Sequence, residues 1–167
     1  MEFKKEIIIN QPIDAVWDVL GNQYSEAYKW ASGLYHSEGS GAPSITGASC
    51  NNRTCETSQG RIKEVIRTFD TNNYTLEYEV IEGFPFFVDQ GINNWQLSKV
   101  GSQTKVNMHL TITTKGLMGK LMGPMMKLQM NKVVANILDD FKQYVETGQP
   151  STRKQKELQK KSRKAAA

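Results

Sequence analysis

Residues 104–145 read TKVNMHLTITTKGLMGKLMGPMMKLQMNKVVANILDDFKQYV, and the spacing of the apolar residues changes within this stretch. Over 104–113 apolar and polar residues alternate, which predicts a strand with one apolar face. From Gly116 to Val145 the apolar residues recur every three or four positions, which predicts a long helix. The helix can bury its apolar side against the strand's apolar face. The apolar residues of the strand are Val106, Met108, Leu110 and Ile112, and His109 falls on the opposite, solvent-facing side.

The sequence marks a break and an end in the long helical stretch. Gly123-Pro124 should interrupt the helix, because proline has no N–H to donate and its ring clashes with the preceding turn. The part from Pro124 to Thr147 has 24 residues and would be about 36 Å long. Gly148 and Pro150 are typical of residues just beyond a helix C-terminus.

Short strands separated by polar turns precede this region and predict an antiparallel meander. Residues 73–82 alternate clearly, with Leu76, Tyr78 and Val80 on one face. The expected strands of the meander are 48–57, 61–69, 73–82, 91–99 and 104–113, with a loop rich in Gly, Ser and Pro before them at 39–47.

The N-terminal part predicts one more strand and two short helices. Residues 3–9 resemble a strand, and Pro12 suits the first turn of a helix that Gly21 can end. A second short helix is expected over Ser25–Trp30. The resulting fold class is α+β: a curved antiparallel sheet wrapped around one long C-terminal helix, with two short helices after the first strand. This arrangement tends to leave a cavity between sheet and helix.

The composition fits one globular domain and excludes several classes of protein. The chain has 167 residues, 38% hydrophobic and 23% charged, with a mean hydropathy of −0.53. No apolar run approaches the roughly 18–20 residues of a membrane-spanning helix. Two cysteines cannot form a disulfide scaffold in a chain of this length. Three Trp, six Tyr, six Phe and seven Met are enough to build a core, which argues against disorder.

The positive charge is concentrated at the C-terminus. The net charge is +4, but residues 149–167 hold seven of the 21 Lys and Arg and one of the 17 Asp and Glu, which leaves −2 on residues 1–148. No nucleic acid is expected on this body, since nucleic-acid-binding folds usually spread basic residues over a face. Residues 149–167 are expected to form a basic, flexible tail capable of weak contact with anionic lipid. No signal peptide is recognisable, so the expected location is cytoplasmic.

Several short motifs follow one another in a defined order. They are IIINQPIDAVW (residues 7–17), Trp30, Gly47 with Arg53, GRIKEVIRTFD (residues 60–70), NWQL (residues 94–97) and the Met-rich terminal helix. Together they resemble the START-like helix-grip superfamily (SRPBCC), in particular its polyketide cyclase/dehydrase and lipid-transport branch, over residues 3–148. The resemblance implies a START-like domain at residues 1–148 that holds a small hydrophobic ligand (lipid, quinone or polyketide-like) between sheet and helix. This fold hosts many functions, so the resemblance specifies the fold better than the activity.

Glu64 is the candidate of most interest for ligand binding. The alternation of residues 61–69 groups Glu64 with Ile66, or else groups Val65 with Phe69, and the residues alone do not decide which group faces the core. The family pattern implies that Glu64 faces the cavity.

Arg53, Cys55 and Thr57 share one face of the preceding strand and could point the same way. A buried carboxylate must be paired or neutral, so an Arg53–Glu64 ion pair is plausible. It would anchor a ligand carbonyl or hydroxyl in an apolar pocket. The alternatives are a purely structural pair or an outward-facing Glu64.

Apolar residues that could be ordinary core are candidate pocket lining under the resemblance. Methionine is unbranched and adapts to irregular shapes, which suits a variable apolar ligand. The hydrophobic turn at 83–87 could gate the cavity mouth or simply plug the end of the sheet. The candidate ligand-binding residues are Arg53, Cys55, Thr57, Glu64, Tyr78, Trp95, Met108, Leu110, Met118, Met122 and Met126, the candidate gate residues are Phe84, Phe86 and Phe87, and Tyr35 is a further candidate for the lining.

Three functions follow from these residues. The first is binding or transport of the hydrophobic ligand, and the alternative is a cyclase or dehydratase with Glu64 or Tyr78 as acid or base. The third is a protein-interaction module that uses the basic tail. Cys50 and Cys55 would lie roughly 16 Å apart on opposite faces of one strand, so no metal site is expected there. No cofactor is expected either. The oligomeric state stays open.

Overall fold

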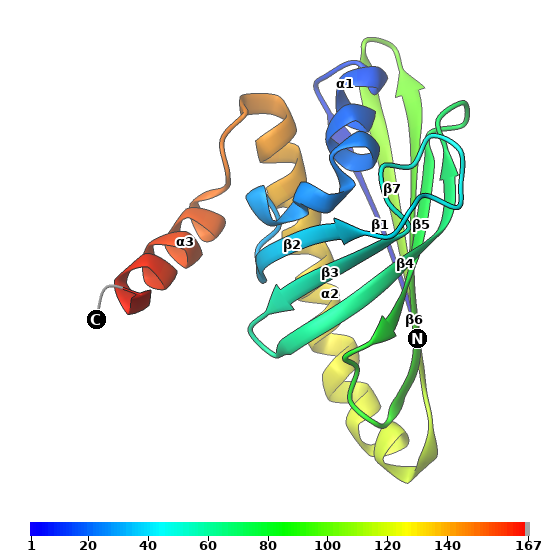
Figure 1. The fold of residues 1–167 in the computed structure, drawn as a ribbon, viewed down its shortest axis with the longest axis vertical. Helices are drawn as coiled ribbons and strands as arrows, with labels where there is room; N and C mark the ends of the chain where they lie inside the picture. Colours follow the sequence, from blue (N-terminus) through cyan, green and yellow to red (C-terminus); the bar gives the residue numbers. More distant parts are fainter. Residues whose placement is uncertain (166–167) are drawn as a thin grey trace.

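The computed structural model describes the backbone of residues 1–165 and the side chains of residues 1–160, and it places one long helix across a curved sheet (Figure 1). This confirms the predicted α+β class. The elements in chain order are β1 (Glu2–Ile9), α1 (Ile13–Trp17), the π-helical turn η1 (Asp18–Asn22), the 3₁₀-helix η2 (Tyr24–Lys29), β2 (Leu34–Ser40), β3 (Asn52–Thr57), β4 (Gly60–Asp70), β5 (Thr75–Glu82), β6 (Val88–Val100), β7 (Gln103–Thr114), α2 (Gly116–Thr147) and α3 (Thr152–Ala165).

The sheet has seven antiparallel strands in the order β1-β7-β6-β5-β4-β3-β2. Strands β2 to β7 pair with their neighbours in sequence, whereas β1 pairs with β7, so that Ile7 lies opposite Val106. The edge strands β1 and β2 are connected by the short helices, which therefore cross from one edge of the sheet to the other.

The predicted alternation of the central strands is confirmed. Leu76 in β5 and Val106 and Met108 in β7 are buried on the side that faces α2. In β4 the register shifts between Ile66 and Thr68. This irregularity allows Glu64 and Phe69, which have opposite parity, both to be buried.

The strand β2 was not expected from the sequence. Its residues, LYHSEGS, show no apolar alternation, and Ser37 is the buried residue among them. It is an edge strand whose conformation depends on pairing with β3, which local sequence does not reveal. The strand expected at 48–57 begins only at Asn52.

The predicted break at Gly123-Pro124 is wrong, because α2 runs without interruption from Gly116 to Thr147. Pro124 and Lys120 are both exposed, so the carbonyl that loses its helical partner at the proline can bond to water. The predicted end at Gly148 is confirmed: this glycine has φ +69°, and its N–H donates to the carbonyl of Tyr144 at 2.7 Å.

A helix, α3, occupies most of the segment expected to be a flexible tail, and its first two turns contact the body. Arg153 Nη1 lies 2.7 Å from Oδ1 of Asp140, a fully buried residue of α2. The Lys154 ammonium donates to the carbonyl of Leu34, and Glu157 accepts from the N–H of Gly33 at 3.0 Å. A charged cluster therefore fixes the start of α3 to α2 and to the loop before β2. The last two residues of the expected tail, 166–167, lie outside the described residues.

The hydrophobic core lies between the concave face of the sheet and the second half of α2. Phe141 of α2 is fully buried, with its ring centroid 4.9 Å from that of Trp30 and 5.7 Å from that of Trp95. The first half of α2 extends away from this core toward the lower end of the molecule in Figure 1. The core thus closes one end of the space between sheet and helix and leaves the rest to a cavity.

Candidate functional site

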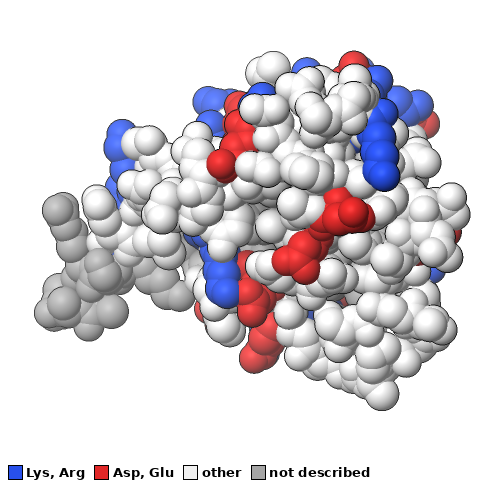
Figure 2. Space-filling view, turned by 90° about the horizontal axis from the view of Figure 1, so that it is seen from above, with Lys and Arg blue, Asp and Glu red and all other residues white. Residues whose placement is uncertain are grey.

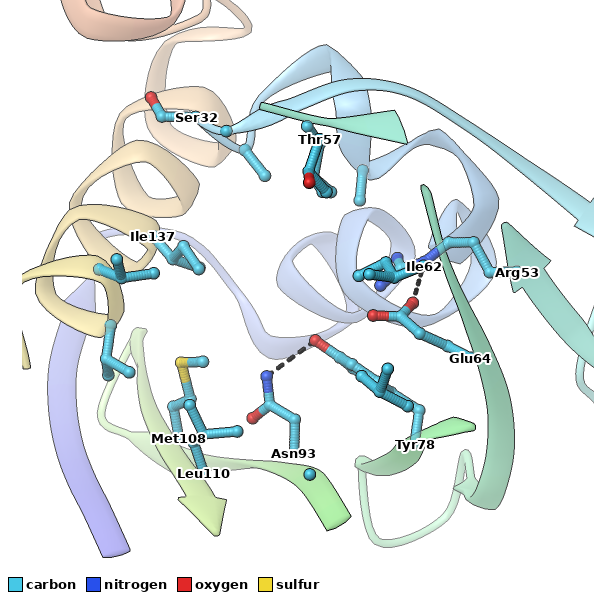
Figure 3. Close-up of a pocket in the computed structure, with 18 of the residues that line it drawn as sticks. Ser32, Arg53, Thr57, Ile62, Glu64, Tyr78, Asn93, Met108, Leu110 and Ile137 are labelled. Carbon is cyan, nitrogen blue, oxygen red and sulfur yellow. Dashed lines mark hydrogen bonds and ion pairs between the residues drawn. The ribbon is translucent and has the colours of Figure 1, made fainter. Parts of the chain in front are cut away.

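A cavity of about 350 Å³ lies between the concave face of the sheet and the second half of α2. Its walls are mostly apolar, with polar side chains gathered on the β3, β4, β5 and β6 side (Figure 3). From α2 it is lined by Met130, Val133, Val134 and Ile137. An apolar cavity with a few grouped polar atoms is the usual form of a small-molecule site.

The predicted ion pair between Arg53 and Glu64 is present at the polar side of the cavity. Arg53 lies on β3 and Glu64 lies opposite it on β4. Arg53 Nε is 2.7 Å from Glu64 Oε2, and the two side chains are only 5% and 6% exposed. Arg53 Nη1 also donates to the main-chain carbonyl of Tyr24 at 2.6 Å. The guanidinium is thus held by the protein itself.

Two further donors reach the same carboxylate oxygen. The Tyr24 hydroxyl donates to Glu64 Oε2 at 3.3 Å, and the Cys55 thiol lies 3.7 Å from it. In Figure 3 the other oxygen of Glu64 points into the cavity. One oxygen is therefore occupied by protein donors, while the other faces the space available to a ligand.

Burial and the ion pair set the protonation of these groups. Burial acts to lower the pKa of Arg53, but the combined effect of Glu64, Tyr24, Cys55 and Tyr78 outweighs it and raises this pKa well above its usual value. Burial raises the pKa of Tyr24 well above its usual value and that of Cys55 to about 12. Arg53 is therefore charged at neutral pH, and the phenol and the thiol stay protonated and act as hydrogen-bond donors.

A second polar pair, Asn93 with Tyr78, lies beside the ion pair. Asn93 Nδ2 donates to the Tyr78 hydroxyl at 2.8 Å, and that hydroxyl points into the cavity (Figure 3). Burial, followed by the nearby charge of Glu64, raises the pKa of Tyr78 to about 12. Because the phenol accepts from Asn93, its own proton is available to a group in the cavity. Asn93 Oδ1 is buried and has no hydrogen-bond partner among the described residues.

Most of the sheet residues predicted to bind a ligand do line the cavity. They are Arg53, Thr57, Glu64, Tyr78, Trp95, Met108 and Leu110. Cys55 is fully buried behind Glu64 rather than part of the wall. Tyr35 does not line the cavity. His109 lies on the outer face of the sheet, where its Nε2 is 3.5 Å from Oε2 of Glu2. Strand parity placed most of these residues, whereas the inward orientation of Glu64 was implied by the family resemblance.

The predictions for the helix and for the gate need correction. Met118, Met122 and Met126 do not line the cavity, because the first half of α2 lies beyond its end; Met130 and the following apolar positions take their place. Of the three gate residues, Phe84 lines the cavity, whereas Phe86 is 76% exposed and Phe87 packs against the core.

Two parts of the site were missed in the sequence. Asn93 has the same parity as Trp95 on β6, so alternation alone could have placed it on the inner face. Tyr24, in η2, and the segment 31–34, which leads from η2 into β2, also reach the cavity, and no local pattern in the sequence points to them. Their position depends on how the short helices cross the sheet.

The family described as polyketide cyclase/dehydrase and lipid transport matches residues 1–146. No match was found among curated proteins. No helix in the described part of the chain is long and apolar enough to cross a bilayer.

Solved structures share the fold at low sequence identity. A START superfamily protein from Mycobacterium smegmatis has a TM-score of 0.70 and 11% identity, covering 87% of this chain and 97% of its own. The protein TTHA0849 from Thermus thermophilus has a TM-score of 0.68 and 17% identity, with the same coverage of 87% and 97%. DynU16, a protein of the dynemicin biosynthetic locus, has a TM-score of 0.62 and 15% identity over 89% of this chain and 48% of its own. These likenesses establish the helix-grip architecture.

Proposed function

Because the chain belongs to the polyketide cyclase/dehydrase and lipid-transport family, we propose that its cavity binds a small, mainly apolar molecule that carries a hydroxyl group. The observation that carries the proposal is the pairing of a donor with an acceptor in an apolar space. The Tyr78 hydroxyl and the free oxygen of Glu64 point into the same part of the cavity (Figure 3). A hydroxyl can accept from the first and donate to the second.

The charges of the site favour a neutral polar group over a charged one. Arg53 is already engaged by Glu64 and by the carbonyl of Tyr24, so it has little left to offer a ligand carboxylate. A carboxylate would also be repelled by Glu64 in a region of low dielectric. The apolar part of the ligand would lie against Met108, Leu110 and the inward residues of α2.

Binding or transport is favoured over catalysis by the same geometry. A cyclase or dehydratase would need Glu64 or Tyr78 to exchange a proton during turnover. With its pKa raised to about 12, Tyr78 stays protonated at neutral pH and is a poor base. Glu64 Oε2 is fixed by Arg53 and Tyr24, which suits a constant acceptor better than a proton carrier.

Native mass spectrometry with organic extraction tests whether the purified protein carries such a molecule. Titration with decanol and with decanoic acid then tests the preference for a hydroxyl. We expect decanol to bind more tightly than decanoic acid. We expect Tyr78→Phe to weaken decanol binding about three- to tenfold, which corresponds to the loss of one hydrogen bond. The matched control is Tyr74→Phe, whose hydroxyl bonds to Asp14 away from the cavity.

Two results would count against the proposal. One is equal affinity for the alcohol and the acid, and the other is an unchanged decanol affinity in Tyr78→Phe. Glu64→Gln separates binding from catalysis, because an amide oxygen still accepts a hydrogen bond but the group no longer exchanges a proton. Retained decanol binding with loss of a measured turnover would assign the chain to the enzyme alternative.

A further inference from the structure

The first half of α2 presents a stripe of large apolar side chains to solvent. Leu117, Leu121, Met125 and Leu128 are 81%, 70%, 59% and 77% exposed. They are separated by four, four and three residues, so they fall on one face of the helix. Exposed apolar residues are common singly, but a contiguous row of four along a helix indicates an interaction surface. We call these four residues the α2 stripe.

The α2 stripe is distinct from the side of the helix that covers the cavity. Met126, Met130, Val133 and Ile137 follow the same spacing on the opposite side and pack toward the core or the cavity. The two rows overlap at residues 126–128, where α2 is apolar on two opposite sides and the folded chain covers only the inner one. A helix that is apolar on both sides needs a second apolar environment.

The charges around the α2 stripe have one sign. Lys120, Lys127 and Lys132 are exposed, and the sequence contains no Asp or Glu between Gly116 and Leu138. None of these three lysines forms an ion pair with a described residue. The face of the body seen in Figure 2 is different, since Lys and Arg are interspersed there with Asp and Glu. The α2 surface thus combines exposed apolar residues with uncompensated positive charge.

The same end of the molecule carries a second exposed apolar group close to the cavity. The Lys115 N–H, just before α2, donates to the carbonyl of Phe87 at 2.9 Å, which holds the β5–β6 loop against the start of the helix. Phe86 of that loop is exposed, while Phe84 and Pro85 line the cavity. A surface that engaged the stripe and Phe86 would therefore lie next to residues of the cavity wall.

We propose that the α2 stripe, with its lysines and Phe86, docks onto the surface of a bilayer that contains anionic lipid. Interfacial helices combine an apolar face with flanking lysines in this way, and each basic residue adds attraction to anionic headgroups. A second copy of the chain is disfavoured as the partner, because a two-fold contact through this surface would bring lysines against lysines. Docking would place the cavity beside the lipid phase from which an apolar ligand can enter.

Co-sedimentation of the full chain with vesicles tests the proposal. We expect binding to vesicles of phosphatidylcholine with phosphatidylserine, much weaker binding to phosphatidylcholine alone, and weakening by added salt. Leu121→Gln combined with Leu128→Gln should reduce binding at least about tenfold, because both side chains would otherwise enter the interface. Lys120→Gln combined with Lys127→Gln should remove most of the preference for phosphatidylserine.

The controls separate this proposal from the proposed function. Val100→Gln removes an exposed apolar side chain at the β6–β7 turn and should leave vesicle binding unchanged. The stripe variants should keep decanol binding, and Tyr78→Phe should keep vesicle binding. Wild-type protein that does not bind the vesicles would overturn the proposal. So would a concentration-dependent dimer that the Leu121 and Leu128 changes abolish in the absence of vesicle binding.

Discussion

Arg53 Nε lies 2.7 Å from Glu64 Oε2, and the two oppositely charged side chains face each other across paired strands on the wall of an apolar cavity. A buried pair of this kind costs desolvation energy that its attraction only roughly offsets, so it seldom adds net stability. Its presence at the wall of a cavity therefore agrees better with a role toward a ligand than with a role in holding the fold.

The pair gives a first prediction about stability. Arg53→Met leaves Glu64 buried without its cation, and we expect a loss of about 3–5 kcal/mol in the free energy of unfolding. The double variant Arg53→Met with Glu64→Leu should recover most of that loss, because neither charge is then buried alone. Urea unfolding followed by circular dichroism measures both. A double variant as unstable as the single one would show that the pair itself holds the fold.

A second prediction concerns alkaline pH. In the unfolded chain Cys55 and Tyr78 ionise near their ordinary pKa values of 9.0 and 10.0, but in the folded protein both pKa values are raised to about 12. At pH values between the unfolded-state and folded-state pKa, the unfolded state binds fewer protons than the folded state. The free energy of unfolding therefore keeps its full value below about pH 9 and falls as the pH rises toward 12. By about pH 11 the raised pKa of the Cys55 thiol alone should lower the free energy of unfolding by about 2–3 kcal/mol. In Cys55→Ala, the free energy of unfolding measured with urea should fall less steeply between pH 9 and 11 than in the wild type. An unchanged slope would contradict a raised pKa for this thiol.

A third prediction concerns the contact between α3 and the loop before β2. The N–H of Gly33 donates to Glu157 of α3, whereas the N–H of Ser32 donates to Oδ2 of Asp140 in α2 at 3.0 Å. We expect Glu157→Ala to speed amide hydrogen exchange at Gly33 about tenfold or more and to affect Ser32 much less. Exchange measured by NMR resolves the two adjacent amides. Equal acceleration at both would mean that the loop opens as one unit.

A fourth prediction contrasts two glycines near the cavity mouth. A Cβ at Gly83 would lie 2.2 Å from the main-chain oxygen of Arg61, and Gly83 itself has a φ of +97°. Gly83→Ala should therefore lower the free energy of unfolding by about 2–3 kcal/mol. A Cβ at Gly91 would lie 2.4 Å from the ring tip of Phe84. The ring can move, so Gly91→Ala should lower the free energy of unfolding by less than about 1 kcal/mol. The displaced ring should change the occupancy of the cavity by decanol. Urea unfolding and native mass spectrometry measure the two effects, and the reverse order of costs would contradict this account.

Much of the cavity wall could be predicted from the sequence because strand parity is a local property. Alternation placed Tyr78, Trp95, Met108 and Leu110 on one face, and side chains on one face of a strand stay together whatever the sheet packs against. The pairing of Arg53 with Glu64 required the family resemblance as well, because that resemblance implied an inward-facing Glu64 and a buried carboxylate then needs a partner. Asn93 has the same parity as Trp95 on β6, so the same reasoning places its amide on the inner face.

The helix side of the cavity could not be predicted in the same way. Periodicity identified α2 as a helix with apolar residues, but it could not show where along the helix the sheet makes contact. The methionines at 118, 122 and 126 and the residue at 130 have the same character, and only the register of α2 against the sheet selects Met130 for the wall. Nor could local rules show that the chain would continue through Pro124, because that depends on the exposure of the neighbouring carbonyl.

The sequence by itself determined the central strands, the long helix that follows them, the apolar face of the central strands and the need of a buried Glu64 for a cationic partner. These follow from the spacing of side chains along a strand or helix and from the cost of burying charge. Only the tertiary structure decided the docking of α3 through Arg153 and Asp140, the edge strand β2 and the exposure of the α2 stripe. Each of these joins or separates residues far apart in the chain, so its energy depends on the packing of whole elements rather than on any local pattern.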